Sequence, residues 1–318
     1  MRLFLILQNI IISYALRIVQ YNVEWLFIDY YKSSDCPGNG CDWKNYSDAE
    51  NHLNIVAKRL KYLDPDIINL CEVEGLTELN MLNSELDNKY SVYFEKGKDT
   101  ATGQNVAMLS KIIPSIDLYR TEIHYEYPIN DSNCNYNGNI SSTGVSKHYI
   151  TEFIFKNMNV AFIAAHLIAF PTSSSRCAQR EAQALILQSI IFDYIQKDYE
   201  IIMIGDFNDY DPNILDVNNH IPISHTLEIL KGMHGTYNGL YNLENIAETI
   251  IQSERYSDWY NSNGKCTPST KDYSMIDHVL VSSGIRNNII NSFIYHGYDE
   301  YCGKYDSDHY PIVIDLIL

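Results

Sequence analysis

The chain alternates short apolar runs with longer stretches in which apolar residues recur at helical spacing. Runs rich in Ile, Val and Tyr and bounded by turn residues predict β-strands at 16–22, 66–71, 90–94, 105–110, 150–155, 159–166, 200–205, 275–282 and 310–317. Helical spacing predicts α-helices at 47–62, 76–88, 176–197, 224–231 and 243–253. Strands and helices mixed at this spacing indicate an α/β or α+β fold.

The longest predicted helix follows a segment that is suited to capping. Pro171-Thr172-Ser173-Ser174-Ser175 offers hydroxyl groups that can accept hydrogen bonds from the first helical N–H groups. Segments dense in Asn, Ser, Tyr, Asp and Gly are predicted to be long surface loops, at 29–46, 126–147 and 256–273. None of these loops carries the shift in composition that marks a domain boundary. We therefore expect residues 16–318 to form a single domain.

The first fifteen residues have the pattern of a leader. Met1-Arg2 precedes an apolar run from Leu3 to Ile12, which ends on Ser13-Tyr14-Ala15, a small-x-small sequence typical of signal-peptide cleavage. The run is too short to span a bilayer comfortably, and no later stretch predicts a membrane span. We therefore expect residues 1–15 to be a signal peptide and the mature protein to be secreted or lumenal. A retained anchor and a buried strand are the alternatives.

Cysteine usage agrees with that compartment. Of the seven cysteines, Cys71 lies inside an apolar run and is expected to be a buried thiol. The other six lie in polar, loop-like surroundings: Cys36, Cys41, Cys134, Cys177, Cys266 and Cys302. An even set in the loops of a secreted chain predicts disulfides, with free thiols as the alternative. The tight loop between Cys36 and Cys41 favours that pair, and the remaining pairing is open.

The net charge of −17 restricts how the protein can meet a polyanion. Binding nucleic acid through a broad basic surface relies on Lys and Arg that replace counterions, and this composition argues against such a surface. An acidic enzyme can still act on phosphate esters if a bound cation supplies positive charge locally.

Polar residues that end or interrupt apolar strands are the strongest chemical signal in the chain. Such positions are costly unless the polar group is used. They are Asn22, Glu24, Glu72, His166, Asp206, Asn208, Asp277, His278, Asp306, Asp308 and His309. Each alone has an ordinary interpretation as a turn or cap residue. If the strand ends converge, however, the oxygen ligands suit Mg²⁺ or Ca²⁺ and the imidazoles suit proton transfer.

The same positions resemble, in order and over nearly the whole mature chain, the motifs of the endonuclease/exonuclease/phosphatase superfamily. The matching segments are Tyr21-Asn22-Val23-Glu24, Leu70-Cys71-Glu72-Val73-Glu74, Asn105-Val106-Ala107-Met108-Leu109-Ser110, Ala165-His166-Leu167, Gly205-Asp206-Phe207-Asn208, Ile276-Asp277-His278 and Ser307-Asp308-His309. Each tripeptide alone is a weak signal. The combination of GDFN and SDH in this order and at this separation is a strong one.

The resemblance implies a DNase I-like fold, a four-layer sandwich of two packed mixed β-sheets flanked by helices. It also implies roles. Glu72 is the expected principal metal ligand, with Asn22, Glu24 and Asp308 near the cation. Asp206 and Asn208 are expected to orient the attacking water and the phosphate, and Asp277 to fix the tautomer of His309. His166 is expected to contact the phosphate or to protonate the leaving oxygen.

Two details narrow the branch of this superfamily. Abasic-site repair enzymes carry Asn where this chain has His166, and inositol 5-phosphatases usually read GDLN followed by aromatic and Arg residues. The chain looks most like a secreted nuclease-like branch, although Cys71 and Gly75 depart from its usual residues. We therefore expect a Mg²⁺-dependent (or Ca²⁺- or Mn²⁺-dependent) DNA or RNA endonuclease. The alternatives are a sphingomyelinase-like lipid phosphodiesterase, an inositol-phosphate phosphatase and a catalytically inactive binding module.

Four basic residues are softer candidates for contacts with a substrate phosphate. Lys147 and His148 begin a strand, where related nucleases often place a basic contact, and a solvated strand end is the alternative. Arg176 and Arg180 begin the long helix just after the His166 loop, and an ion pair with Glu181 or a neighbour is the alternative. The expected partner is a phosphodiester, most simply nucleic acid, and the protein is expected to be a monomer.

Overall fold

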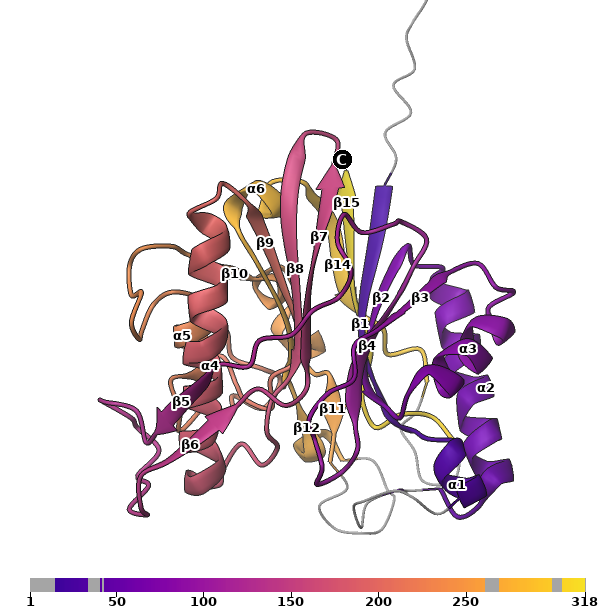
Figure 1. Cartoon of the computed structure of the whole chain (residues 1–318), viewed down its shortest axis with the longest axis horizontal. Coiled ribbons are helices and arrows are strands. Elements are labelled where there is room, and N and C mark those ends of the chain that lie inside the picture. The colour runs from indigo at the N-terminus through magenta and orange to yellow at the C-terminus, as the bar shows by residue number, and fades with distance from the viewer. Residues whose placement is uncertain (1–14, 34–40, 42, 261–268, 299–304, 318) are drawn as a thin grey trace, which may run out of the picture.

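Two β-sheets pack face to face, and helices cover the outer face of each (Figure 1). The structure is a computed structural model that describes residues 15–33, 41, 43–260, 269–298 and 305–317. The expected signal peptide therefore lies outside the described residues, apart from Ala15. Within the described part of the chain, no helix has the length and apolar character needed to cross a membrane.

The first sheet has the strand order β14-β15-β1-β2-β4-β3. Its strands are β1 (Ala15–Leu26), β2 (Ile67–Val73), β3 (Ser91–Phe94), β4 (Asn105–Ser110), β14 (Ile289–Ile294) and β15 (Ile312–Ile317). Strands β1 and β2 run parallel, whereas β1 pairs antiparallel with β15 and β2 with β4. The sheet is therefore mixed, and the carboxyl ends of β1 and β2 lie at the same edge.

The second sheet has the strand order β10-β13-β9-β8-β7. Its strands are β7 (His148–Phe155), β8 (Met158–His166), β9 (Glu200–Asp206), β10 (Glu244–Asn245) and β13 (Asp277–Val281). Strands β8 and β9 are parallel, so His166 pairs with Asp206 at their carboxyl ends. Strand β13 runs antiparallel to β9 and brings its first residue, Asp277, opposite Asp206.

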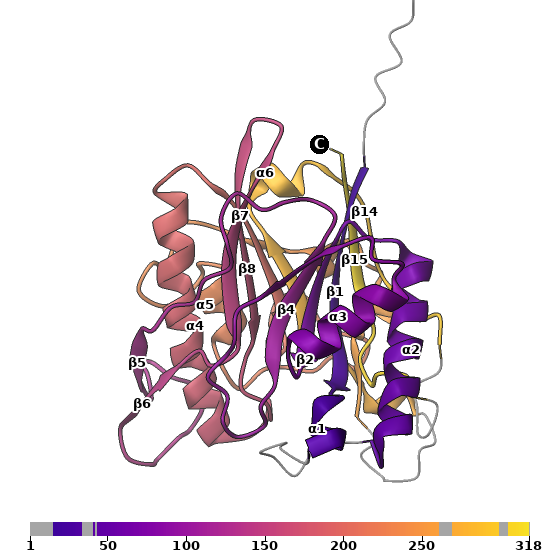
Figure 2. The same cartoon turned by 45° about the vertical axis from the view of Figure 1, so that its right-hand side comes forward.

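Helices form the two outer layers. On the first sheet lie α2 (Tyr46–Leu63) and α3 (Leu76–Glu85), and on the second lie α4 (Ser174–Ile195) and α5 (Thr226–Leu230) (Figures 1 and 2). Between the sheets, Ile18 and Met108 of the first share one buried cluster with Phe162 and Ile204 of the second. Separate clusters bury the apolar faces of the helices. The expected four-layer sandwich of two mixed sheets is confirmed.

One predicted helix is wrong. Residues 243–253 form β10 followed by two 3₁₀ turns, η1 (Ile246–Thr249) and η2 (Gln252–Glu254). Leu243, Ile246 and Ile250 are buried at a spacing that imitates one face of an α-helix. Asn245 pairs with Leu280 at the edge of the sheet, and its side chain accepts a hydrogen bond from the N–H of Ala247. Sheet pairing and this cap therefore override the helical periodicity.

The structure adds short elements that the sequence pattern does not predict. Short pairs of antiparallel strands lie within or beside two predicted loops: β5 (His124–Tyr127) with β6 (Ser141–Gly144), and β11 (Asp258–Trp259) with β12 (Tyr273–Ser274). The edge strand β14 and the short helices α1 (Asp29–Ser33), α6 (Ser283–Arg286) and η3 (Thr270–Asp272) were also missed. Most residues of β5, β6 and β14 are partly or fully exposed, so they lack the apolar alternation that marks a strand.

The described cysteines comprise one free thiol and three that form disulfides, which agrees with the expectation for Cys71. Cys71 is a buried free thiol, and burial raises its pKa. Cys134 and Cys177 form a disulfide that ties the loop before β6 to the first turn of α4. Cys41 is disulfide-bonded, and the expected partner, Cys36, lies outside the described residues.

Candidate active site

Asn22, at the end of the regular pairing between β1 and β2, lies at the centre of the converging strand ends. Its Nδ2 atom lies 3.2 Å from Oε1 of Glu72 on β2 and 3.0 Å from Oδ2 of Asp206 on β9. The same atom lies 3.3 Å from Nε2 of His309, which directly precedes β15. One fully buried amide therefore joins side chains from both sheets. From the sequence, a shared site was expected only if the strand ends converge. In the structure they do converge.

His309 is oriented from behind by Asp277. Nδ1 of His309 lies 2.7 Å from Oδ2 of Asp277, an arrangement that leaves Nε2 facing the cleft. Gln20 donates to the other oxygen of Asp277 at 3.0 Å, and the Ser257 hydroxyl donates to Oδ2 at 2.9 Å. The carboxylate is thereby fixed on both sides, as an orienting group behind an imidazole requires.

Three residues of this cluster escaped the sequence analysis. Gln20 and Ser257 hold Asp277, and Asp258 places Oδ1 3.7 Å from Nε2 of His309. Gln20 was detectable as a polar residue inside an apolar strand, two positions before Asn22. Ser257 and Asp258 lie in a predicted loop and carry no sequence signal of their own.

Burial and mutual repulsion perturb the carboxylates of the cluster. Burial, followed by the charge of Asp277, raises the pKa of Asp206 to about 8. Burial raises the pKa of Asp258 to about 6, and it also raises the pKa of Glu72. Burial opposes the protonation of His309, but Asp277 and then Asp308 and Asp258 outweigh it and raise the pKa of this imidazole well above its ordinary value. The carboxylates of the cluster therefore outnumber the positive charges that surround them.

His166 lies in an environment that disfavours a charged imidazole. Burial, helped by Lys147, lowers its pKa well below the ordinary value. Its Nε2 atom lies 3.5 Å from Oδ2 of Asp206 and 4.0 Å from Oε1 of Glu72, while Nδ1 has no hydrogen-bond partner among the described residues. Of its two expected roles, a hydrogen bond to the phosphate fits a neutral ring better than proton donation by a cation.

Several backbone conformations that are unusual for non-glycine residues occur at the same place. Glu24, Trp25, Glu72 and Asn208 all have positive φ, at 48°, 52°, 68° and 50°. Such conformations cost free energy in residues with a Cβ atom and persist where the surroundings over-determine them. Gly205, with φ 150°, leaves no room for a side chain, because an added Cβ would lie 1.8 Å from the carbonyl oxygen of Ala165. The local chain is therefore shaped around this cluster.

The donor set fits a divalent cation. Two triplets place ligand atoms within 4.8 Å of one another: Asp206, Asp277 and His309, and Asp258, Asp308 and His309. Glu72 and the amide of Asn22 add oxygen atoms that hard cations prefer. Glu24 accepts a hydrogen bond from the N–H of Asp308 at 3.0 Å, which links the two outer carboxylates. Since several buried carboxylates have a raised pKa, a cation would balance a charge deficit that the chain itself leaves.

The cluster forms the floor of a cleft of about 970 Å³. Its walls come from the β5–β6 hairpin, the loop before α4 and the start of α4. Cationic side chains on the walls are Lys98, Arg120, Lys147 and Arg176. Aromatic side chains on the walls are Trp25, Phe170, Tyr210 and Tyr260. The cleft is therefore far larger than a single phosphate group and offers both charged and flat apolar contacts.

The four basic residues that were candidates for contacts with a substrate phosphate separate into two groups. Lys147 and Arg176 line the cleft. The Nζ atom of Lys147 donates to Gln104 at 3.2 Å and lies 3.9 Å from a carboxylate oxygen of Asp99. The side chain of Arg176 is exposed and makes no hydrogen bond or ion pair with any described residue.

The expectation for His148 and Arg180 needs correction. Both ring nitrogens of His148 are engaged, because Nε2 accepts from the N–H of Thr121 and Nδ1 contacts the carbonyl of Val145. Arg180 is fully buried, and its Nε donates to Asp209 at 2.9 Å rather than to Glu181. Neither side chain lines the cleft. The ring nitrogens of His148 and the guanidinium of Arg180 already make hydrogen bonds inside the protein.

A two-sheet sandwich with a cluster of carboxylates and imidazoles at the strand ends is the architecture of a family whose members hydrolyse phosphoester bonds. The chain belongs to the Endonuclease/Exonuclease/phosphatase family, whose model matches residues 19–309. The comparison with curated proteins gave no match.

Solved structures with the same fold include three informative relatives. Truncated TDP2 from Caenorhabditis elegans is 14% identical, with a TM-score of 0.57, and the match covers 96% of this chain and 98% of that one. D. rerio TDP2, complexed with a single-strand DNA product, is 15% identical, with a TM-score of 0.52 and coverage of 95% and 98%. The mannosyl-6-phosphatase of Bacteroides thetaiotaomicron is 15% identical, with a TM-score of 0.55 and coverage of 95% and 100%. At these identities the likeness shows the fold alone.

Proposed function

We propose that the protein is a secreted, Mg²⁺-dependent phosphodiesterase that cleaves nucleic acid. The observation that carries this proposal is the cleft. It extends from the Asn22 cluster between walls that bear four cationic and four aromatic side chains. A small phosphomonoester would leave most of that volume unused, whereas a polymer with a phosphate and a flat base in every unit can use both kinds of contact.

The side chains on the floor of the cleft and those directly beneath it have complementary tasks in this proposal. Asn22 holds Glu72 and Asp206 apart and in register, and Asp277 keeps Nε2 of His309 turned to the cleft. Oδ2 of Asp206, 3.0 Å from Nδ2 of Asn22 and 3.5 Å from Nε2 of His166, is placed to accept a proton from the attacking water once a bound cation keeps this carboxyl ionised. When bound, a divalent cation supplies positive charge to the phosphate oxygens as negative charge grows on them.

The charge distribution supports a polyanionic substrate despite the net charge of −17. Arg176 lies on the wall of the cleft without a carboxylate partner among the described residues, whereas Lys98 pairs with Glu122 and Lys147 lies 3.9 Å from Asp99. Few cations contact the substrate in this arrangement, and we therefore expect only a moderate dependence of binding on salt concentration.

A lipid phosphodiesterase is a weaker candidate. Contact with a bilayer would require an exposed apolar hairpin or loop. The β5–β6 hairpin beside the cleft carries mainly polar side chains, such as His124, Glu126 and Ser142. Its exposed apolar residues, Ile123, Tyr125 and Ile140, each stand singly between polar neighbours and form no continuous apolar tip. This mixed surface favours an aqueous substrate over a membrane lipid.

Secretion rests on two features. The pattern of residues 1–15 is that of a signal peptide. The Cys134–Cys177 disulfide is suited to an oxidising compartment. Fractionation of cells that express the full chain would test this part of the proposal, because an intracellular protein with an uncleaved leader contradicts it.

A metal-dependent activity screen of the purified chain tests the enzymatic proposal. Single-stranded DNA, plasmid DNA, RNA, sphingomyelin vesicles and inositol phosphates are incubated side by side with MgCl₂ or with excess EDTA. We expect cleavage of nucleic acid that EDTA abolishes and that Asp206→Asn lowers by about 10²- to 10⁴-fold. Asp193→Asn, which changes an exposed residue of α4, serves as the matched control. Activity confined to sphingomyelin or inositol phosphates, or activity that survives EDTA, contradicts the proposal.

A further inference from the structure

Phe170 exposes its ring on the wall of the cleft in an unfavourable backbone conformation. The residue is 64% exposed and lines the same cleft as Glu72 and His309. Its φ of 71° lies in the left-handed region, which a residue with a bulky side chain rarely adopts. Both the hydration of the ring and the backbone conformation cost free energy, so the surrounding structure must hold this residue in place.

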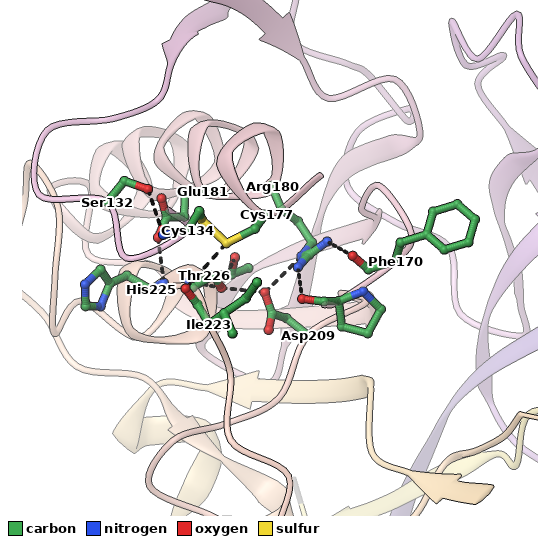
Figure 3. Close-up of a disulfide and its surroundings, with 12 residues drawn as sticks. Ser132, Cys134, Phe170, Cys177, Arg180, Glu181, Asp209, Ile223, His225 and Thr226 are labelled. Carbon is green, nitrogen blue, oxygen red and sulfur yellow. Dashed lines mark hydrogen bonds and ion pairs between the residues drawn. A yellow bond between two sulfur atoms is a disulfide. The ribbon is translucent and has the colours of Figure 1, made fainter. Parts of the chain in front are cut away.

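Arg180 is the side chain that holds it. The buried guanidinium donates to the carbonyl oxygens of Ile168, Phe170 and Pro171, at 3.1, 3.4 and 3.1 Å. Its Nε donates to Asp209 at 2.9 Å. Figure 3 shows the ring of Phe170 pointing away from Arg180 while its carbonyl faces the guanidinium. The loop is thus fastened from its inner side, and the ring is left outside.

Hydrogen bonds also join the start of this loop to the proposed reaction site. The N–H of Leu167 donates to the carbonyl of Asp206 at 2.9 Å, and Asn208 donates to the carbonyl of Leu167 at 3.2 Å. Phe170 follows His166 by four residues, so their Cα atoms are at most about 14 Å apart. A short stretch of a bound oligonucleotide can therefore reach both residues.

Arg176 supplies a cation at the same wall. It lies in the first turns of α4 next to Cys177, whose disulfide with Cys134 anchors this end of the helix (Figure 3). Its side chain is exposed in the cleft and makes no hydrogen bond or ion pair within the described part of the chain. An exposed aromatic ring and an exposed guanidinium thus lie on the same wall of the cleft.

We propose that Phe170 and Arg176 form a subsite for one unpaired nucleobase and its phosphate, and that the enzyme therefore prefers single-stranded nucleic acid. This inference rests on the proposed nuclease function. Every base offers a flat face that can stack on an aromatic ring, so the contact does not depend on sequence. Bases inside a duplex already stack on both faces and would have to be unstacked, at a cost of free energy, to reach Phe170.

Steady-state kinetics on matched oligonucleotides test the subsite. The substrates are a single-stranded DNA of mixed sequence, the same DNA in a duplex, and an abasic strand of equal length. Stacking on one base corresponds to roughly a 5- to 150-fold change in affinity. We therefore expect Phe170→Ala to raise KM for the single strand by a factor in that range, with a much smaller change in kcat. Phe170→Trp should keep KM low, and Arg176→Gln should raise KM on the normal and abasic strands alike.

Two comparisons separate failure of the subsite from failure of the nuclease function. On the abasic strand, the difference in KM between the wild-type protein and Phe170→Ala should disappear, because no base is present to stack. The matched control is Tyr62→Ala, which removes an exposed ring on α2, 72% exposed and outside the cleft. Efficient cleavage of the single strand with an unchanged KM in Phe170→Ala overturns the subsite alone. No metal-dependent cleavage of any oligonucleotide by the wild-type protein overturns both proposals.

Discussion

Two clusters of largely buried charged side chains share one segment of the chain. The cleft cluster consists of Glu72, Asp206, Asp258, Asp277 and His309, and the scaffold cluster consists of Arg180, Asp209, Asp211, Lys231 and Asn245. The segment Gly205-Asp206-Phe207-Asn208-Asp209-Tyr210-Asp211 contributes to both. Asp206 faces the cleft, whereas Asp209 and Asp211 face the interior.

The two clusters differ in how their charges are balanced. In the scaffold cluster each carboxylate has a cation, Asp209 with Arg180 at 2.9 Å and Asp211 with Lys231 at 2.7 Å. Burial would raise the pKa of Asp211, but the charge and hydrogen bonds of Lys231 outweigh burial and lower it. In the cleft cluster, burial and the charge of Asp277 raise the pKa of Asp206 to about 8, because one readily protonated imidazole, that of His309, faces several carboxylates.

This difference distinguishes a structural cluster from a functional one. In the scaffold cluster, side chains of the protein balance every carboxylate charge, so the cluster can hold loops in place without any ligand. The cleft cluster keeps buried carboxylates short of positive charge, which is stable only with protonation or with a bound cation. The deficit itself therefore marks the site where a metal and a phosphate would bind.

The largest expected effect comes from removing one charge of the cleft cluster. Glu72→Gln keeps the shape of the side chain but removes a metal ligand, and we expect kcat/KM to fall by about 10²- to 10⁴-fold. In the absence of metal the variant should be no less stable than the wild-type protein, because a buried carboxylate is lost. Activity assays and thermal unfolding with and without MgCl₂ measure both effects.

The matched control for this variant is Glu85→Gln, which removes an exposed carboxylate from α3. MgCl₂ should raise the Tm of the wild-type protein and of the control but not that of Glu72→Gln, since a ligand that binds only the folded state stabilises it. Equal stabilisation of all three proteins by MgCl₂ contradicts the assignment of Glu72.

Breaking the scaffold cluster should damage stability. Arg180→Met leaves the buried carboxylate of Asp209 without its cation, and breaking such a pair typically costs about 3–5 kcal/mol of unfolding free energy. Arg176→Met, on the same helix but exposed, should cost within about 0.5 kcal/mol. Urea unfolding with the disulfide intact measures both losses. A loss as small for Arg180→Met as for Arg176→Met would show that the pair is dispensable.

The smallest expected effect is a dependence on pH. Because the pKa of Asp211 is lowered in the folded state, the unfolded chain binds more protons in acid, and this contribution to stability is lost as the pH falls through the folded pKa. Lys231→Met removes the cause of the lowering. The gap in unfolding free energy between the wild-type protein and the variant should therefore narrow from neutral pH to below about pH 4. A gap that stays constant over this range contradicts the linkage.

The strand-end residues were predictable because their cost is visible in the sequence. A polar residue such as Asn22, Glu72 or Asp206 in an apolar strand needs a use, and the order of the motifs connected these residues to one family. The helix predicted at 243–253 failed because sheet pairing of Asn245 overrode a periodic apolar pattern. Asp258 was missed because a loop residue carries no periodic pattern, although the fold brings it to 3.7 Å from His309.

By itself, the sequence determined the class of fold, the order of the main strands and helices, and the residue types that gather at the strand ends. These follow from local periodicity and from the cost of burying polar groups. Only the tertiary structure decided which of Asp206, Asp209 and Asp211 faces the cleft and which meets a buried cation. It also turned Arg180 inward and left the ring of Phe170 exposed. These outcomes depend on partners far apart in the chain, such as Asp211 and Lys231 or Asp277 and His309, which only folding brings together.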